Sequence, residues 1–434
     1  MRRFKETDVE WIGKIPQDWE VKPIKQVYRF QTGWTPATSD ESNFEGDNIW
    51  VNISDMKQRI IYDSAKHISD KAVAISSMNI SPKGSLLYAF KLSVGAVAFC
   101  GKDLYTNEAI ATFLPCENSL EYLFYAAPIF IIENANENIY GAKLLNQQLI
   151  NNAKIVVPPI GEQQRIADYL DSKCSKIDSI IEKQQAVIEK LKEYKLSVIT
   201  EAVTKGLNPD VEMKDSGVEW IGDINSEYAI TRVGALCFVT KLAGFEYTDT
   251  MVNAIKTEGD VPIVRAQNVR MFEFNDNINE FIDFETSSKL DRCALNKKSV
   301  LITFIGAGIG EVCVLDQKKR YHLAPNVAKI EIRKEYSDLL SEKYLMYYLG
   351  SNAGKGEISK ISKASAQPSL SMGTIRGIQI VLPSKDEQYF ITEFLDKKCK
   401  SIDVLIESKS KFIDKLHEYK KALIYEVVTG KKEV

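Results

Sequence analysis

The amino-acid sequence predicts an α+β protein built as a tandem repeat, in which two mixed α/β domains are each followed by a long helix. Three observations support this prediction. A charged segment near the middle of the chain recurs at its end, an aromatic motif near the start recurs after the middle, and both charged segments have heptad spacing. A chain of 434 residues is longer than a domain with a single hydrophobic core usually is, and its length suits two or three domains.

The charged segment gives the stronger repeat. Residues 157–204 align without gaps with residues 382–429, and 22 of the 48 aligned positions are identical. Identity of this density within one chain indicates a duplication. The shared pairs include Glu162-Gln163 with Glu387-Gln388 and Leu170-Asp171 with Leu395-Asp396.

The aromatic motif extends the duplication to the domains before the helices. Val9-Glu10-Trp11-Ile12-Gly13 recurs as Val218-Glu219-Trp220-Ile221-Gly222 at an offset of 209 residues, and the helical segments are offset by 225. The second copy therefore has a net insertion of 16 residues between about 230 and 380. Gly206 and Pro209 end the first helix. We expect a first domain at 1–157, its helix at 158–205, a linker at 206–216, a second domain at 217–382 and its helix at 383–434.

The two helical segments have the spacing of a coiled coil. Apolar residues recur alternately three and four positions apart, and charged residues occupy the other faces. Polar residues interrupt this seam at Gln184 and Lys409. The alternative, that each helix packs only on its own domain, explains the sustained seam less well. The predicted seam consists of Ile177, Ile181, Gln184, Ile188, Leu191, Ile402, Ile406, Lys409, Ile413 and Leu416.

The segments before the helices contain short β-rich runs bounded by turn residues. Residues 85–90 and 96–99 of the first copy have counterparts at 299–304 and 311–315 of the second. Identity elsewhere in these segments is low, so the scaffold repeats while its side chains differ. The glycine-rich run 306–310 follows a predicted strand without a helix signal after it, which favours a tight turn over a nucleotide loop.

The motifs of common enzyme classes are missing from the sequence. It has no G-x-x-x-x-G-K-[ST] phosphate loop, no methyltransferase Asn-Pro-Pro-Tyr or Asp-Pro-Pro-Tyr motif, three widely spaced histidines, and seven scattered cysteines without a C-x-x-C pair. We therefore expect no catalytic residue, metal or cofactor in this chain. The scattered cysteines and the lack of a long apolar run predict a cytoplasmic protein with reduced thiols and no membrane segment.

Polar and basic loop residues suit the reading of DNA bases, because Arg and Lys bind guanine and Asn and Gln bind adenine. The net charge of −3 requires that positive charge be gathered on one surface or that a partner supply phosphate contacts. Any one such residue is more often a solvated side chain, and residues 354–367 are expected to form a Ser/Gly/Lys loop. The DNA-binding candidates are Asn52, Lys57, Arg59, Lys91, Lys143, Gln147, Arg265, Gln267, Asn268, Arg270, Lys318, Lys319, Arg320, Lys360, Lys363 and Gln367.

The chain resembles the specificity subunits of type I restriction–modification systems over its whole length. The resemblance rests on Val9-Glu10-Trp11-Ile12-Gly13-Lys14-Ile15-Pro16 followed by Trp19, and on the duplication of this motif. It also rests on the duplicated run Pro158-Pro159-Ile160-Gly161-Glu162-Gln163, which leads into Leu170-Asp171. The second copy departs from this pattern where Tyr389-Phe390 stand in place of Gln164-Arg165.

This resemblance implies that each domain is a target recognition domain that reads one half of a bipartite, asymmetric site in double-stranded DNA. The helices would form an antiparallel coiled coil with pseudo-twofold symmetry, set the spacing and dock two modification (methyltransferase) subunits. S-adenosylmethionine would belong to those subunits, and ATP and magnesium to restriction subunits that translocate and cleave DNA. The alternative function is an interaction scaffold with two non-DNA ligand-binding modules, which salt-dependent DNA affinity would distinguish.

Overall fold

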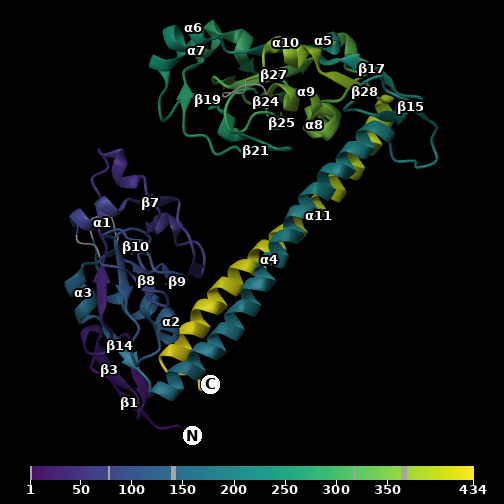
Figure 1. Cartoon of the computed structure of the whole chain (residues 1–434). Coiled ribbons are helices and arrows are strands. Elements are labelled where there is room, and N and C mark those ends of the chain that lie inside the picture. The colour runs from purple at the N-terminus through teal and green to yellow at the C-terminus, as the bar shows by residue number, and fades with distance from the viewer. Residues whose placement is uncertain (1, 77–78, 138–142, 317, 363–368) are drawn as a thin grey trace. The chain divides into compact units, whose positions relative to one another are not determined.

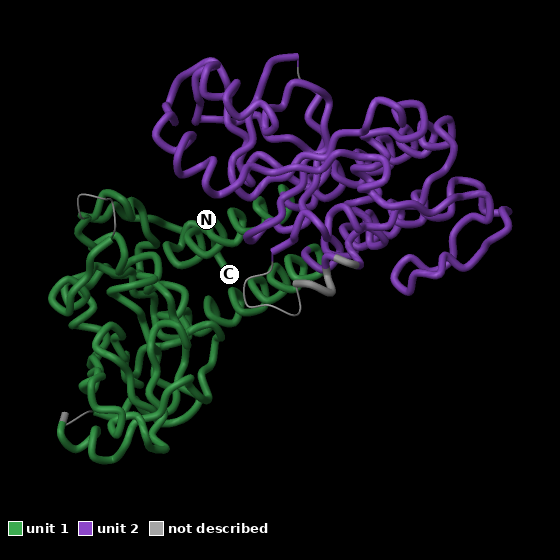
Figure 2. Tube along the Cα trace, turned by 90° about the horizontal axis from the view of Figure 1, so that it is seen from above, with its two compact units in different colours: residues 1–184, 411–434 green, residues 185–410 purple. Residues whose placement is uncertain are grey.

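The computed structural model describes residues 2–76, 79–137, 143–316, 318–362 and 369–434 (Figure 1). It divides into two compact units (Figure 2). Unit 1 comprises residues 1–184 and 411–434, and unit 2 comprises residues 185–410. Each unit contains one mixed α/β domain and a part of both long helices, α4 (Ile160–Lys205) and α11 (Lys385–Val428). Among the described residues, no helix is long and apolar enough to cross a membrane.

The domain of unit 1 is built on a mainly antiparallel five-stranded sheet. Its central strand β8 is buried along its whole length because all four of its residues are apolar or aromatic. Helix α2 (Leu120–Phe130) contacts this sheet and buries seven of its residues. The sheet order is β4 (Phe30–Thr32), β11 (Ile110–Phe113), β8 (Leu86–Ala89), β9 (Val97–Cys100) and β6 (Ile60–Ile61).

Smaller elements complete the domain of unit 1. A three-stranded sheet has the order β10 (Tyr105–Thr106), β5 (Asn48–Val51) and β7 (Lys66–Ile68). The two-stranded pairs are β1 (Phe4–Glu6) with β2 (Lys14–Pro16), β3 (Glu20–Pro23) with β14 (Lys154–Val157), and β12 (Asn136–Glu137) with β13 (Lys143–Leu144). The remaining α-helices are α1 (Asp70–Ser76) and α3 (Gln147–Asn152).

Unit 2 repeats this architecture. Its main sheet has the order β18 (Cys237–Lys241), β27 (Val327–Ile332), β24 (Ser299–Thr303) and β25 (Val312–Leu315), which matches β4, β11, β8 and β9. The second sheet has the order β22 (Phe281–Ile282), β19 (Val261–Val264), β26 (Tyr321–Leu323) and β23 (Ala294–Leu295). The repeated scaffold predicted from the sequence is thus confirmed. Helix α8 (Glu342–Gly350) contacts β24 and β25 as α2 contacts β8 and β9.

The remaining elements of unit 2 are short. The two-stranded pairs are β15 (Met213–Asp215) with β16 (Asp223–Asn225), β17 (Ala229–Arg232) with β28 (Gln379–Leu382), and β20 (Val269–Arg270) with β21 (Glu273–Phe274). The helices are α5 (Val233–Leu236), α6 (Gly244–Glu246), α7 (Phe284–Lys289), α9 (Asn352–Ser362) and α10 (Met372–Gly377). The run 306–310 is the turn between the antiparallel strands β24 and β25, as predicted.

The extra residues of the second copy are spread over several connections. The first residues of β3 and β17 are 20 and 229, an offset of 209, and those of β5 and β19 are 48 and 261, an offset of 213. The offset is 217 between β11 and β27, which begin at 110 and 327, and 225 between β14 and β28, which begin at 154 and 379. The insertion therefore lengthens loops and leaves the strand order intact.

The two long helices pack together within each unit. In unit 1 the Nζ of Lys420 lies 2.7 Å from the carboxylate of Asp178, and in unit 2 Lys195 makes the equivalent 2.7 Å ion pair with Asp403. Both equivalences are offsets of 225 residues, so the same Asp–Lys contact joins the two antiparallel helices in each unit. Of the predicted seam residues, Ile177, Ile188, Ile402 and Ile413 are buried, and Ile181, Gln184, Leu191, Ile406, Lys409 and Leu416 are half-buried.

The polar seam residues Gln184 and Lys409 are half-buried. Extending the register of the Asp–Lys pairs along the heptads sets Gln184 against Ile413 in unit 1 and Lys409 against Ile188 in unit 2. Polar seam residues fix register at a cost in stability. We expect the double variant Gln184→Leu/Lys409→Leu to unfold at a higher temperature, by about 1–2 kcal/mol of added apolar burial. The matched variant Lys183→Leu/Ser408→Leu places leucine at two exposed positions and should not gain this stability. A loss of stability in the seam variant would contradict the assignment.

Both chain ends lie on unit 1 (Figure 1). The hydroxyl of Tyr425 donates to the carbonyl of Trp11 at 3.1 Å, and that of Tyr122 lies 3.3 Å from the carbonyl of Val428. In unit 2 the hydroxyl of Tyr344 likewise donates to the carbonyl of Val203, near the end of α4, at 2.9 Å. The end of α11 is thus held on unit 1 as the end of α4 is held on unit 2.

This equivalence predicts that the chain tolerates circular permutation. Joining the two ends through a short linker and opening the chain near Asn208 should leave the contacts of both units in place, because nearby surface ends permit such a change. The permuted protein is expected to unfold within a few degrees of the parent. A permutant that is unfolded, while a parent carrying only the added linker residues at its end is folded, would show that the two connections are not equivalent.

Candidate nucleic-acid interface

A short 3-10 turn follows the corresponding strands β5 and β19 and carries several of the candidate base-reading residues. In unit 1 the side chain of Asn52 accepts hydrogen bonds from the backbone N–H of Ser54 at 2.7 Å, and Asp55 accepts from the backbone N–H of Asn52 at 2.9 Å. In unit 2 the backbone N–H of Arg265 donates to Oδ1 of Asn268 at 2.9 Å. The two turns are therefore built alike, with Asp55 and Asn268 in the same capping role.

The structure corrects the prediction for Asn268. Its side chain is buried, and its Nδ2 donates to the carbonyls of Asn275 at 2.9 Å and Asn277 at 3.3 Å. With Oδ1 accepting from Arg265, both ends of the amide are used inside the protein. Asn268 therefore shapes the loop instead of presenting its amide to a base. Asn52 likewise caps its own turn, but it is only half-buried.

Several basic candidates are engaged in ion pairs. Arg265 pairs with Glu280 at 2.5 Å and Arg320 with Asp291 at 2.7 Å, and Arg320 also donates to the hydroxyl of Ser287. Partly exposed pairs of this kind contribute little free energy, so a phosphate or a guanine edge can replace the carboxylate. The other paired candidates are Arg59 with Asp171, Lys91 with Glu108 and Lys143 with Glu137.

A further group of candidates is exposed. Gln267 precedes the buried Asn268 on the connection from β19 to β20, Arg270 is the last residue of β20, and Lys57 lies on the corresponding connection of unit 1. Lys318 and Lys319 lie on the connection between β25 and β26, where the Nζ of Lys319 lies 4.9 Å from the ring centre of Tyr321. Gln147 is exposed as well, and its side-chain amide donates to Thr32.

The predicted Ser/Gly/Lys loop is helical in its first part. Helix α9 spans Asn352–Ser362 and includes Lys360, while Lys363 and Gln367 lie outside the described residues. A Cβ atom at Gly354 would overlap the backbone of Tyr348 and Leu349, and one at Gly356 would overlap the indole ring of Trp220. The two glycines thus serve close helix packing instead of loop flexibility, which corrects that prediction.

The repeated Glu-Gln pair anchors each long helix to its own domain. Gln163 is fully buried, and its amide accepts from the backbone N–H of Ser119 and donates to Asn118 and to the carbonyl of Pro158, all at 2.9 Å. Gln388 repeats this pattern with Ser341, Leu339 and Pro383 at 2.8–3.0 Å. Each glutamine thus satisfies backbone and side-chain groups that burial would otherwise leave unpaired.

The glutamate of each pair binds an aromatic residue of the domain. The indole N–H of Trp19 donates to Glu162 at 2.6 Å, and Arg2 forms a 2.7 Å ion pair with the same carboxylate. In unit 2 the hydroxyl of Tyr228 donates to Glu387. These contacts give a physical reason why the aromatic position and the glutamate both recur in the two copies. Together they hold the start of each long helix on its domain.

A second anchor joins the Leu-Asp pair of each helix to a tyrosine. Tyr125 donates to Asp171 at 2.6 Å, and Tyr347 donates to the equivalent Asp396 at 2.8 Å. Burial and the neighbouring carboxylate raise the pKa of Tyr125, so the phenol remains protonated and acts as the donor. The sequence reasoning did not identify these tyrosines. Their signal is the run Tyr122-Leu123-Phe124-Tyr125, which recurs as Tyr344-Leu345-Met346-Tyr347.

The described residues hold no group of three or more His, Cys, Asp or Glu side chains placed to bind a metal ion. The cysteines within this part of the chain are mostly buried and form no disulfide bond. The arrangement that the structure presents is therefore one of repeated helix anchors, with different polar and basic side chains on the corresponding turns of the two domains.

The sequence matches the family described as "Type I restriction modification DNA specificity domain" over residues 16–190 and 242–411. It is 28% identical over 395 residues to the type I restriction enzyme MjaIX specificity subunit of Methanocaldococcus jannaschii, covering 88% of this chain and 86% of the relative. The fold is similar, at a TM-score of 0.73 and 15% identity, to a chain from a structural study of type I R-M complex assembly, with coverage of 96% and 99%. The HsdS subunit from Thermoanaerobacter tengcongensis aligns with a TM-score of 0.51 at 15% identity, covering 98% of this chain and 100% of that one.

Proposed function

Because the chain belongs to the family of type I restriction modification DNA specificity domains, we propose that it is the DNA-reading subunit of a type I restriction–modification complex. The domain of each unit reads one half of a bipartite, asymmetric site. The observation that carries this proposal is the contrast between the two copies. Their strand order and helix anchors repeat, whereas the side chains on the turns after β5 and β19 differ. A repeated frame with two different readers suits a site whose halves differ.

The long helices set the spacing between the two half-sites and dock two modification subunits. Exposed apolar side chains support this role. In unit 1 they are Ile180, Phe412 and Tyr419, and in unit 2 they are the equivalent residues Leu405, Val187 and Tyr194, with exposed fractions between 37% and 53%. Ile180, Val187, Leu405 and Phe412 each immediately precede a predicted seam position, and equivalent apolar positions on both helices suit two copies of one partner.

Catalysis and cofactors belong to the partners in this proposal. The modification subunits bind S-adenosylmethionine and methylate the DNA, and restriction subunits bind ATP and magnesium to translocate and cleave it. This chain is not an enzyme and contributes target choice. The negative net charge is consistent with partners that supply phosphate contacts.

The test uses this chain assembled with its modification subunits, after methylome sequencing has identified the target. The exposed pair Gln267 and Arg270 should contact the second half-site. The variant Gln267→Ala/Arg270→Ala is expected to lose about 1–3 kcal/mol of discrimination at those base pairs, roughly 5- to 150-fold in affinity. The first half-site should be read as before.

The matched variant Lys57→Ala in the other domain should affect only the first half-site. DNA affinity should also fall steeply with rising salt concentration, because phosphate contacts release counterions. An assembled complex without salt-dependent DNA affinity would support the interaction-scaffold alternative. Equal effects of both variants on both half-sites would contradict the division of labour between the domains.

A further inference from the structure

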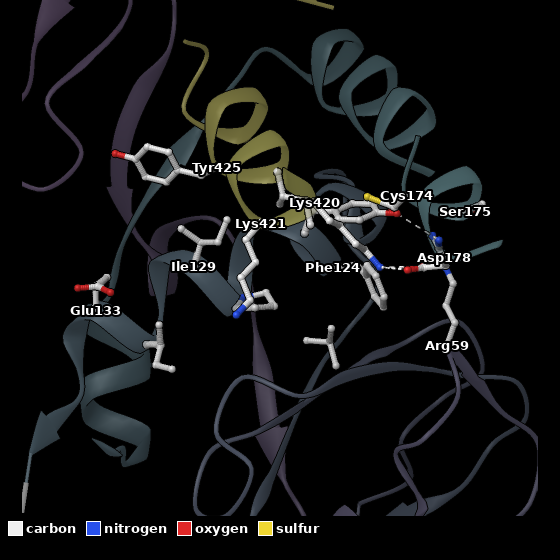
Figure 3. A pocket seen from close by; sticks show the side chains of 15 residues that line it. Arg59, Phe124, Ile129, Glu133, Cys174, Ser175, Asp178, Lys420, Lys421 and Tyr425 are labelled. Atoms are coloured by element: carbon white, nitrogen blue, oxygen red, sulfur yellow. Dashed lines mark hydrogen bonds and ion pairs between the residues drawn. The ribbon is translucent and has the colours of Figure 1, made fainter. Parts of the chain in front are cut away.

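Unit 1 contains a hollow of about 820 Å³ between its domain and the two long helices (Figure 3). One wall is formed by α2 and the turn after it, with Phe124, Tyr125, Pro128, Ile129 and Ile132. The opposite wall comes from the first part of α4 and the end of α11. Its lining residues there are Cys174, Ser175, Asp178, Lys420, Lys421, Ile424 and Tyr425. The hollow is thus apolar at its walls and carries charged groups at its edge.

The corresponding place in unit 2 is occupied by the side chain of Phe272. Its ring centre lies 5.2 Å from that of Tyr347, the equivalent of Tyr125. The Nζ of Lys195, the equivalent of Lys420, lies 5.9 Å from the same ring centre. Two residues that line the hollow of unit 1 therefore have counterparts that contact a phenyl ring in unit 2.

Gly350 shows that unit 2 is adapted to this ring. A Cβ atom at Gly350 would overlap the ring of Phe272, whereas the equivalent position in unit 1 is Pro128, which lines the open hollow. Phe272 also has a φ of +67°, a backbone conformation that is uncommon for residues other than glycine. Such a conformation persists where packing enforces it, so the ring is held in place by its neighbours.

Unit 1 supplies no such ring from the corresponding connection. Arg59 lies there instead, and its guanidinium forms a 2.7 Å ion pair with Asp171 and lies 4.7 Å from the ring centre of Phe124. Arg59 therefore borders the hollow without filling it (Figure 3). The two copies share the surrounding frame and differ in whether the chain itself occupies the space.

We propose that the hollow of unit 1 binds a segment of a partner polypeptide through an aromatic side chain. The ring packs against Tyr125 beside Lys420, as Phe272 packs at a tilt against Tyr347 beside Lys195. Aromatic stacking and a nearby ammonium group both favour a ring in this position. The volume exceeds that of one phenyl ring several times, so the neighbouring residues of the segment also enter it. A buried aromatic anchor in a pocket is the usual centre of a protein interface.

The test titrates the full chain with N-acetyl-phenylalaninamide as the probe. Binding is measured from the NMR shifts of the methyl groups of labelled isoleucines. Saturable binding in the millimolar range is expected, with shifts at Ile129 and Ile424. The variant Ile132→Trp fills the hollow from its half-buried edge and should weaken binding at least tenfold. N-acetyl-alaninamide at the same concentration should cause no comparable shifts.

A second variant uses the repeat as its own control. Phe272→Gly removes the phenyl ring that occupies the corresponding space in unit 2, and glycine adopts the positive φ at this position without strain. The probe should then also shift the methyl signals of Ile199, the equivalent of Ile424. If Phe272→Gly fails to fold, the Ile132→Trp comparison decides. Absence of saturable binding, or binding that Ile132→Trp does not weaken, would overturn the proposal. A concentration-dependent dimer abolished by Ile132→Trp would also overturn it, since the occupant would then be a second copy of this chain.

Discussion

Removing one heptad from each long helix is expected to abolish methylation at the natural target and to create a target with the same half-sites and a shorter spacer. The deleted segments are residues 181–187 of α4 and residues 410–416 of α11, each of which lies between the ion-paired Asp and Lys of its own helix. Seven residues shorten a helix by about 10 Å, which is about three base-pair steps. Deleting whole heptads keeps the apolar seam continuous.

The measurement is methylome sequencing of a host that carries the shortened chain with its modification subunits. The control Lys183→Ala/Lys415→Ala removes two exposed side chains from the same segments without changing helix length, and it should leave the target unchanged. An unchanged spacer in the folded deletion variant would show that the helices do not set the spacing. Altered half-sites would show that the helices take part in base reading.

The variant Gln163→Leu is expected to destabilise unit 1 by about 3 kcal/mol. The substitution removes three hydrogen bonds of a fully buried amide and leaves the Ser119 N–H and the Pro158 carbonyl without their partner. Each buried group left unpaired costs about 1–3 kcal/mol, although local rearrangement recovers part of that cost. For a unit of this size, the melting temperature should fall by about 6–12 °C.

Scanning calorimetry checks this expectation. Gln164→Leu, one position along the helix, changes an exposed glutamine and should shift the free energy of unfolding by no more than about 0.5 kcal/mol. The equivalent variant Gln388→Leu should lower the stability of unit 2 to a similar extent. Equal stability of Gln163→Leu and Gln164→Leu would show that the buried amide does not anchor the helix.

The sequence alone predicted the repeated scaffold and the two long helices. It could do so because these features depend on spacing along the chain. A heptad places every third and fourth side chain on one helix face, and a duplicated segment folds in the same way twice. The Glu-Gln and Leu-Asp pairs are identical in both copies because each copy makes the same hydrogen bonds between helix and domain.

The tertiary structure alone decided which polar residues face solvent and where the two copies differ in packing. Asn268 and Gln267 are neighbours of similar chemistry, yet one is buried with its amide fully bonded and the other is exposed. Gly354 and Gly356 suggested a loop, but both lie in a helix, where Gly354 packs closely on the backbone of Tyr348 and Leu349 and Gly356 packs on the ring of Trp220. Phe272 fills a place that remains open in unit 1. In each case the deciding contacts depend on how the backbone folds in space, which residue type and spacing along the sequence do not specify.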